Sequence, residues 1–120
     1  MKNVFSLSMK EFFIHYIIRE DKVSENIARV KEVFNSLNRT PIKGMSYSSY
    51  LVGDNLFVHI ARFEDDAVIS DFSTQIEFQK FVDELEFRLK EEPIENHIRE
   101  IGFYRNMEGA PSEMSDGADC

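Results

Sequence analysis

Hydrophobic and polar residues alternate along the chain with two different periods, and their order predicts the secondary structure. Residues 12–19, FFIHYIIR, are apolar at nearly every position and rich in aromatic and β-branched side chains, which is typical of a strand buried on both faces. From Ser24, a predicted N-cap, to Pro41, apolar residues recur at helical spacing with polar residues between them. This segment predicts an amphipathic helix that needs a sheet to cover its apolar side.

Residues 44–63, GMSYSSYLVGDNLFVHIARF, return to the strand pattern twice. Two apolar, aromatic-rich runs flank Gly53, Asp54 and Asn55, so the segment predicts a β-hairpin. Residues 67–72, which follow the hairpin, show no pattern that assigns them to a helix or a strand.

The second half of the chain repeats the helix and strand patterns. The spacing of Thr74 and Glu77 predicts a capping box at the start of a second amphipathic helix, and residues 96–105, NHIREIGFYR, predict a final strand. Residues 106–120 contain Gly, Pro, Ser and acids without a period. A mobile acidic tail is therefore expected after a domain that spans residues 1–105.

The order strand-helix-strand-strand-helix-strand predicts an α+β fold of the ferredoxin-like β-α-β-β-α-β type. In this arrangement a four-stranded antiparallel sheet has its first and third strands at the centre, and right-handed crossovers place both helices on one face. The opposite face has no cover within the chain, although the central strands are apolar at both parities. Because such a face favours association, we expect a homodimer in which two sheets form a dimeric α/β barrel and bury on the order of 2,000 Å².

The charge and the cysteine content of the chain limit which partners and which cellular location are expected. The 120 residues carry a net charge of −8 without a basic stripe, so nucleic acid and anionic membrane surfaces are not expected partners. No apolar run is long enough to span a membrane, and the N-terminus lacks the pattern of a signal peptide. The single cysteine, Cys120, cannot form an internal disulfide and predicts a reducing, cytoplasmic location.

Several segments together resemble a known family. They are FFIHYIIRED, ENIARVKEVFNSLNRT, GMSYSSYLVGDNLFVHIARFED, the second helix ending in KEEP, and EIGFYR. These segments look like the antibiotic biosynthesis monooxygenase-like group of dimeric α/β-barrel proteins, over residues 12–105. The resemblance implies a ferredoxin-like dimer, and better-known members include cofactor-independent oxygenases of phenolic polyketides and haem-degrading enzymes. Haem-degrading relatives rely on a tryptophan, which this sequence lacks, so no cofactor is expected.

Two histidines, one in each predicted central strand, are candidate general bases. Alternation puts each of them on the same side of its strand as two apolar residues: His15 with Phe13 and Ile17, and His59 with Phe57 and Ala61. We predict that this side of both strands lines the barrel interior, where the histidines would be catalytic and the apolar residues would bind substrate. In each case a hydrogen-bonded structural histidine is the alternative.

The tyrosine beside His59 depends on the hairpin loop. A two-residue loop pairs Tyr50 with His59, whereas a three-residue loop pairs Ser49 with His59 and moves Tyr47 onto the same face. Either tyrosine could donate a hydrogen bond to a developing oxyanion, or fill the barrel mouth or dimer seam as an aromatic side chain. The sequence leaves both registers open.

A metal site is not expected, because His15, His59 and His97 show no ligand spacing. Two hypotheses of different class remain. The first is a cofactor-independent oxygenase or isomerase that acts on a small apolar phenol- or quinone-like molecule, with His59 as the base. The second is a non-catalytic homodimer that binds a small apolar ligand or serves as an interaction module.

Overall fold

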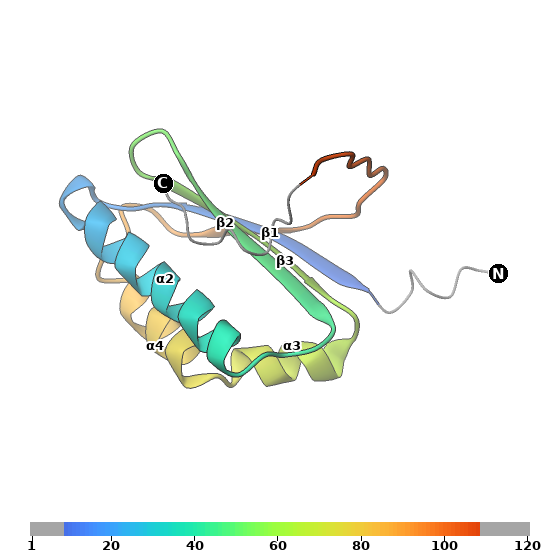
Figure 1. The fold of residues 1–120 in the computed structure, drawn as a ribbon. Helices are drawn as coiled ribbons and strands as arrows, with labels where there is room; N and C mark the ends of the chain where they lie inside the picture. Colours follow the sequence, from blue (N-terminus) through green and yellow to red (C-terminus); the bar gives the residue numbers. More distant parts are fainter. Residues whose placement is uncertain (1–8, 109–120) are drawn as a thin grey trace.

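The computed structural model describes residues 9–108, which form one antiparallel sheet with helices on a single face (Figure 1). The strands are β1 (Lys10–Ile17), β2 (Met45–Val52), β3 (Leu56–Phe63) and β4 (Ile94–His97). The helices are the 3₁₀ turn η1 (Glu20–Lys22), α2 (Val23–Arg39), α3 (Asp66–Ser73) and α4 (Ile76–Leu85). The sheet order β2-β3-β1-β4 places β1 and β3 at the centre. The predicted ferredoxin-like α+β fold and its strand order are confirmed.

The helices begin at other residues than predicted. Helix α2 starts at Val23, directly after η1, and no side chain caps it, so the assignment of Ser24 as an N-cap is wrong. The segment without a pattern is helix α3, whose N-cap Asp65 accepts a hydrogen bond from the backbone N–H of Val68 at 3.1 Å. The Thr74 hydroxyl donates to the carbonyl of Ser70 at 2.9 Å, so this residue ends α3 and does not begin α4.

Strand β4 is shorter than predicted. Its backbone hydrogen bonds to β1 stop where the N–H of Glu100 bonds to a side chain of β1 and not to its backbone. Ile98 still donates its N–H to the carbonyl of Glu11 at 3.0 Å, but the N–H of Glu100 donates to the carboxylate of Glu11 at 2.9 Å. Beyond this point residues 99–108 are exposed and leave the sheet on the side away from the helices (Figure 1). The predicted acidic tail lies outside the described residues from position 109 onward.

The β2–β3 hairpin has the longer of the two predicted loops. Leu51 pairs with Phe57, and Gly53 takes a positive φ of 64°, which glycine adopts without strain. Asn55 closes the loop onto the end of β1: its backbone carbonyl accepts from the N–H of Ile18, and its side-chain amide donates to the carbonyl of Ile18, both at 3.0 Å. These two bonds explain why Asn55 belongs to the loop. Its backbone carbonyl and its side-chain amide bond to Ile18 at the end of β1 and not to β2.

The two faces of the sheet differ in cover. The helix face carries the buried side chains Tyr16, Phe57, His59, Ala61 and Phe63, which pack on Val30 and Val33 of α2, Phe72 of α3 and Phe81 of α4. The open face carries the partly exposed side chains Phe13, His15, Ile17, Leu56, Val58 and Ile60, with Tyr50 on the edge strand. The predicted apolar face without a helical cover is therefore present.

We expect Ile18→Ala to lower the free energy of unfolding by about 3 kcal/mol, because Ile18 is fully buried and truncation leaves a cavity. For a domain of this size the melting temperature should fall by roughly 15 °C. Urea denaturation followed by circular dichroism measures the change. Val82→Ala, at an exposed position of α4, is the matched control and should stay within about 0.5 kcal/mol of the wild type. Equal losses in the two variants would contradict the assignment of Ile18 to the core.

Candidate functional site

The two candidate histidines lie on opposite faces of the sheet. In the β1–β3 register Ile14 pairs with His59, and His15 pairs with Val58. Paired residues share a face, so His15 lies on the open face, whereas His59 is buried under the helices. The prediction that both histidines line one cavity is wrong, because each strand was assigned from its own alternation and the antiparallel register offsets the two patterns by one residue.

The four predicted substrate-binding residues also lie on two different faces of the sheet. Phe13 and Ile17 lie on the open face, as expected, but Phe57 and Ala61 lie on the helix face. The prediction that Phe57 and Ala61 line the barrel interior is therefore wrong. The helices instead pack on the aromatic side, where Phe57 stacks on the ring of Tyr16 at 5.7 Å between centroids.

His59 stands among three hydroxyl groups. Its Nε2 lies 2.7 Å from the Tyr16 hydroxyl, and its Nδ1 lies 2.6 Å from Ser49 Oγ and 3.1 Å from the Tyr47 hydroxyl. Tyr47 is thus the tyrosine that the three-residue loop brings to His59. Tyr50 pairs with Val58 on the other face and is 53% exposed, so the alternative of a two-residue loop, which placed Tyr50 opposite His59, is wrong.

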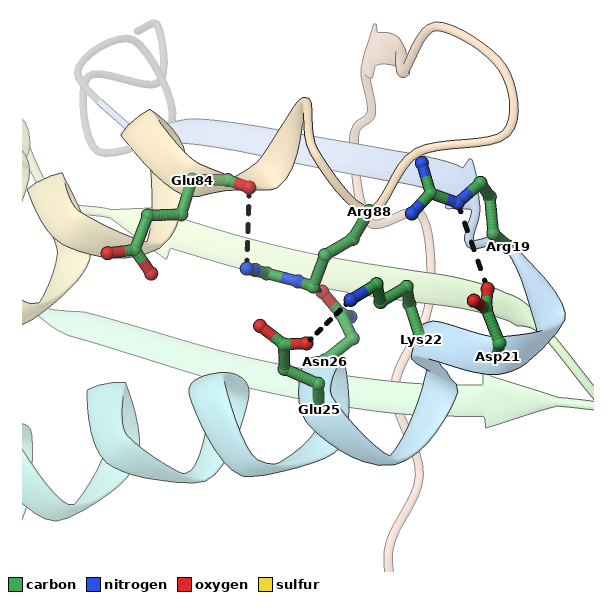
Figure 2. A network of polar contacts seen from close by, with 7 residues as sticks. All are labelled: Arg19, Asp21, Lys22, Glu25, Asn26, Glu84 and Arg88. Atoms are coloured by element: carbon green, nitrogen blue, oxygen red, sulfur yellow. Dashed lines mark hydrogen bonds and ion pairs between the residues drawn. The ribbon is translucent and has the colours of Figure 1, made fainter.

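A second pair of side chains extends this cluster toward the helices. Asn26 of α2 donates its Nδ2–H to the Tyr16 hydroxyl at 3.2 Å, and its Oδ1 accepts from Nε of Arg88 at 2.9 Å. Arg88 follows the end of α4, and Figure 2 shows its guanidinium lying toward Asn26. We call His59, Tyr16, Tyr47, Ser49, Asn26 and Arg88 the polar cluster. It joins three strands, helix α2 and the turn after α4 inside the core.

The chemistry of Arg88 sets the direction of the hydrogen bonds. An arginine only donates, so Asn26 must turn its oxygen toward Arg88 and its NH₂ group toward Tyr16. The Tyr16 oxygen therefore accepts from Asn26 and donates its own hydrogen to Nε2 of His59. Nε2 is then the unprotonated nitrogen, and the imidazole hydrogen sits on Nδ1, where it points to Ser49 and Tyr47.

Burial controls the charge of the polar cluster. Removal from water lowers the pKa of His59 to about 4, so its imidazole is neutral at neutral pH. Burial also raises the pKa of Tyr16 well above its ordinary value, against the opposing effects of the Asn26 hydrogen bond and the Arg88 charge. The pKa of Tyr47 is raised by burial as well. The cluster thus holds neutral side chains beside the Arg88 cation.

Aromatic rings surround the polar cluster. The ring of Phe81 lies edge-on to His59 with the centroids 6.0 Å apart, and the Arg88 guanidinium carbon lies 5.5 Å from the centroid of the same ring. On the other side Tyr47 stacks on Phe34 at 5.0 Å. These rings keep the surroundings apolar, which strengthens each electrostatic interaction within the cluster.

Three members of the polar cluster, Tyr16, Asn26 and Arg88, were not predicted from the sequence, although a signal for two of them exists. Asn26 occupies an apolar position of the α2 stripe, four residues before Val30, and Arg88 continues the α4 stripe seven residues after Phe81. A polar residue at a position where the period requires an apolar one indicates a buried polar contact.

The other polar features of the described residues lie away from this cluster. No group of three His, Cys, Asp or Glu side chains within residues 9–108 is placed to hold a metal ion, and none of their helices could span a membrane. A surface groove of about 250 Å³ is lined by side chains of mixed charge: Glu32, Asn35, Arg39, Glu77 and Lys80. It contains none of the predicted site residues.

Solved structures share this fold over nearly their whole length. An antibiotic biosynthesis monooxygenase superimposes with a TM-score of 0.66 at 12% identity, over 78% of this chain and 99% of that one. The chain has the fold of the antibiotic biosynthesis monooxygenase-like proteins. A protein from Mycobacterium tuberculosis gives a TM-score of 0.69 at 12% identity over 82% and 100% of the two chains. A conserved protein from Methanosarcina mazei gives 0.67 at 15% identity over 80% and 96%.

Other comparisons add no family assignment. No protein-family model and no curated protein matches the chain. The structural likeness at such low identity establishes the fold, whereas the activity has to be argued from this chain's own side chains.

The depressed pKa of His59 predicts a pH-dependent stability. The unfolded chain binds a proton on this residue below the ordinary value of 6.5, whereas the folded chain binds it only below about 4. Between these values the unfolded state binds more protons, so stability falls as the pH falls. Relative to His59→Gln, the wild type should lose about 2 kcal/mol more between roughly pH 7.5 and pH 5. Urea titrations at the two pH values measure this difference, and parallel pH profiles of the two proteins would contradict it.

Proposed function

We propose that this protein is a cofactor-independent oxygenase of the antibiotic biosynthesis monooxygenase type, acting on a small phenol- or quinone-like molecule. The observation that carries the proposal is the polar cluster, in which a buried histidine is linked through Tyr16 and Asn26 to a buried cation. The fold shared with an antibiotic biosynthesis monooxygenase supports the same class of reaction. The site proposed here lies between the sheet and the helices.

In this proposal His59 accepts the acidic proton of the substrate. A phenol or enol that enters the cluster would take the place of Tyr16 as the donor to Nε2, the nitrogen that carries the unshared electron pair. Tyr47 and Ser49 accept from Nδ1 and hold the imidazole in that tautomer. The apolar rings exclude water from the resulting anion.

The anion then supplies the electrons for the reaction with molecular oxygen. For an activated ring CH₂ group, one oxygen atom becomes the carbonyl of the product and the other leaves as water. Both hydrogens of the CH₂ group end in that water. The substrate provides all four electrons, so the balance needs no metal, flavin or external reductant.

We also propose that the molecule is a homodimer joined through the open face. The apolar side chains on that face have no helix over them among the described residues. The exposed segment beyond β4 adds Ile101, Phe103 and Tyr104, which are 91%, 71% and 85% exposed. Apolar surface of this extent favours a second copy of the chain, because the two faces are complementary by symmetry.

The catalytic proposal is tested by oxygen uptake with a panel of hydroquinones and anthrones. We expect His59→Gln to lower kcat/KM at least about 100-fold, the usual contribution of a general base, while a hydrogen-bond acceptor toward Tyr16 is retained. His97→Gln, on the exposed strand β4, is the matched control and should keep the wild-type rate. A wild-type protein that consumes no oxygen with any member of the panel, or a His59→Gln variant as active as the wild type, would refute the proposal.

One observation favours a second function, that of a non-catalytic homodimer that binds a ligand or serves as an interaction module. Both nitrogens of His59 already have hydrogen-bond partners within the protein, as in a structural histidine. In that case phenols or quinones would raise the melting temperature of the protein without being turned over.

A further inference from the structure

Arg88 is the only charged side chain that is fully buried within residues 9–108. It is 1% exposed. An arginine stays protonated in proteins, so it cannot avoid the cost of burial by losing its charge. Buried charges are normally paired with an opposite charge and hydrogen-bonded on every side. The surroundings of Arg88 therefore need an explanation.

The partners of the guanidinium are few and neutral. Nε donates to Asn26 Oδ1 at 2.9 Å, and Nη1 donates to the carbonyl of Glu84 at the long distance of 3.4 Å. Nη2 is buried, and within the described part of the chain no acceptor lies in hydrogen-bond reach of it. Two of the three guanidinium nitrogens thus have weak contacts or none.

The nearest acids do not neutralise this charge. Glu25 and Glu84 attract Arg88 electrostatically, but neither forms an ion pair with it among the described contacts. The carboxylate of Glu25 lies 3.5 Å from Nζ of Lys22. Figure 2 shows the carboxylate of Glu84 pointing away from the guanidinium, which contacts only its backbone carbonyl.

The backbone holds Arg88 in place on both sides. Its carbonyl accepts from the N–H of Arg19 at 2.9 Å, and the N–H of Lys90 donates to the carbonyl of Ile17 at 2.8 Å. These bonds fasten the segment after α4 to the end of β1, while the ring of Phe81 lies beside the guanidinium. A charged group on so fixed a segment is pre-organised to bind a ligand.

The proposed reaction needs a positive group of this kind. A neutral imidazole of low proton affinity cannot retain a proton taken from a phenol unless the resulting anion is stabilised. Hydrogen bonds through Asn26 and Tyr16 connect Arg88 to His59. The ring of Phe81 lies against both Arg88 and His59. An aromatic ligand against Phe81 would thus lie beside the base and the cation.

We propose that Arg88 is a ligand-binding residue whose Nη groups bind the anionic oxygen of a small aromatic or enolic compound. The ligand class is a phenol or enol, and Arg88 binds the oxyanion that this ligand becomes once His59 has accepted its proton. This assignment rests on the proposed function and deepens it, because it states which form of the substrate the polar cluster recognises. The guanidinium replaces the water that would otherwise solvate the oxyanion.

The probes for this assignment are 4-nitrophenol, at a pH at which it is ionised, and 4-nitroanisole, its neutral methyl ether. Binding is measured by calorimetry under nitrogen, so that no turnover occurs. We expect the wild type to bind the phenolate at least about tenfold more tightly than the ether. Arg88→Met should lose this preference. Arg88→Lys keeps a charge but lacks the planar fork, so it should bind the phenolate at least about threefold more weakly than the wild type.

Two measurements guard against a merely structural effect. The Nε–H resonance of Arg88 in the wild type should shift during a titration with 4-nitrophenolate and stay in place with 4-nitroanisole. Arg19→Lys, an exposed arginine close to Arg88 in Figure 2, is the matched control and should keep the preference for the phenolate. If Arg88→Met does not fold, the phenolate affinity of Arg88→Lys and the Nε–H resonance of Arg88 in the wild type still test the assignment.

Equal affinity for the two probes, no binding of either, or an unchanged preference in Arg88→Lys would overturn the assignment. The outcome is separable from that of the proposed function. Selective binding of the phenolate without oxygen uptake supports the oxyanion site and refutes the oxygenase. Oxygen uptake that is unchanged in Arg88→Lys refutes the oxyanion site and leaves the oxygenase in place.

Discussion

Replacing Asn26 by leucine should lower the free energy of unfolding by about 3 kcal/mol or more. Asn26 is fully buried, and it is the acceptor for Nε of Arg88 as well as the donor to the Tyr16 hydroxyl. Leucine fills a similar volume but leaves a buried guanidinium and a buried hydroxyl without these bonds, which costs far more than one neutral hydrogen bond. Urea denaturation at neutral pH measures the loss.

A second substitution distinguishes the effect of the unpaired Arg88 charge from the effect of poor packing around the new leucine. In the double variant Asn26→Leu/Arg88→Met the uncompensated charge is gone, so at least about 2 kcal/mol of the loss should be recovered. Asn35→Leu, on the exposed side of the same helix, should change stability by less than about 0.5 kcal/mol. If the double variant were less stable than Asn26→Leu alone, the stabilising role of Asn26 would not act through Arg88.

The second large effect is expected on assembly. Replacing Ile60 by glutamate places a carboxylate in the middle of the open face, beside Phe13. In a separate subunit this carboxylate would be solvated at little cost, but in the proposed dimer both copies would have to lose their water. We expect the dimer dissociation constant to rise about 1,000-fold or more, which corresponds to about 4 kcal/mol.

Analytical ultracentrifugation at micromolar concentration distinguishes the two states. Val82→Glu makes the same chemical change at an exposed position of α4, on the helical side of the molecule, and should leave the dimer intact. A wild-type protein that sediments as a monomer, or an Ile60→Glu variant that sediments as a dimer, would rule out assembly through the open face.

Most of the fold could be predicted because its main elements have local causes. The spacing of apolar residues gave helix α2, and the turn residues gave the β2–β3 hairpin. Helix α3 was missed because its start depends on one Asp65 side chain bonding to Val68, within a segment too short to show a period. Strand β4 ended early because Glu11 offers its carboxylate to Glu100, a contact between residues far apart in sequence.

The site was harder to predict because it depends on relations between strands. His59 lies in a central strand, as predicted, but its face follows from pairing with Ile14, which no single-strand pattern contains. Tyr47 was one of two alternatives, since the hairpin register depends on how Asn55 bonds to Ile18. Arg88 was missed because charged residues are expected at the surface.

The donor-only nature of Arg88 has a consequence for the uniqueness of the folded state. With arginine in place, Asn26 has a single permitted orientation, and every hydrogen bond from there to Ser49 has a single direction. A glutamine at position 88 could either donate or accept, so both orders of the hydrogen bonds would have similar energy. The core would then populate two interconverting states, with the imidazole hydrogen on Nδ1 in one and on Nε2 in the other. One cation thereby selects one of two nearly equivalent ground states.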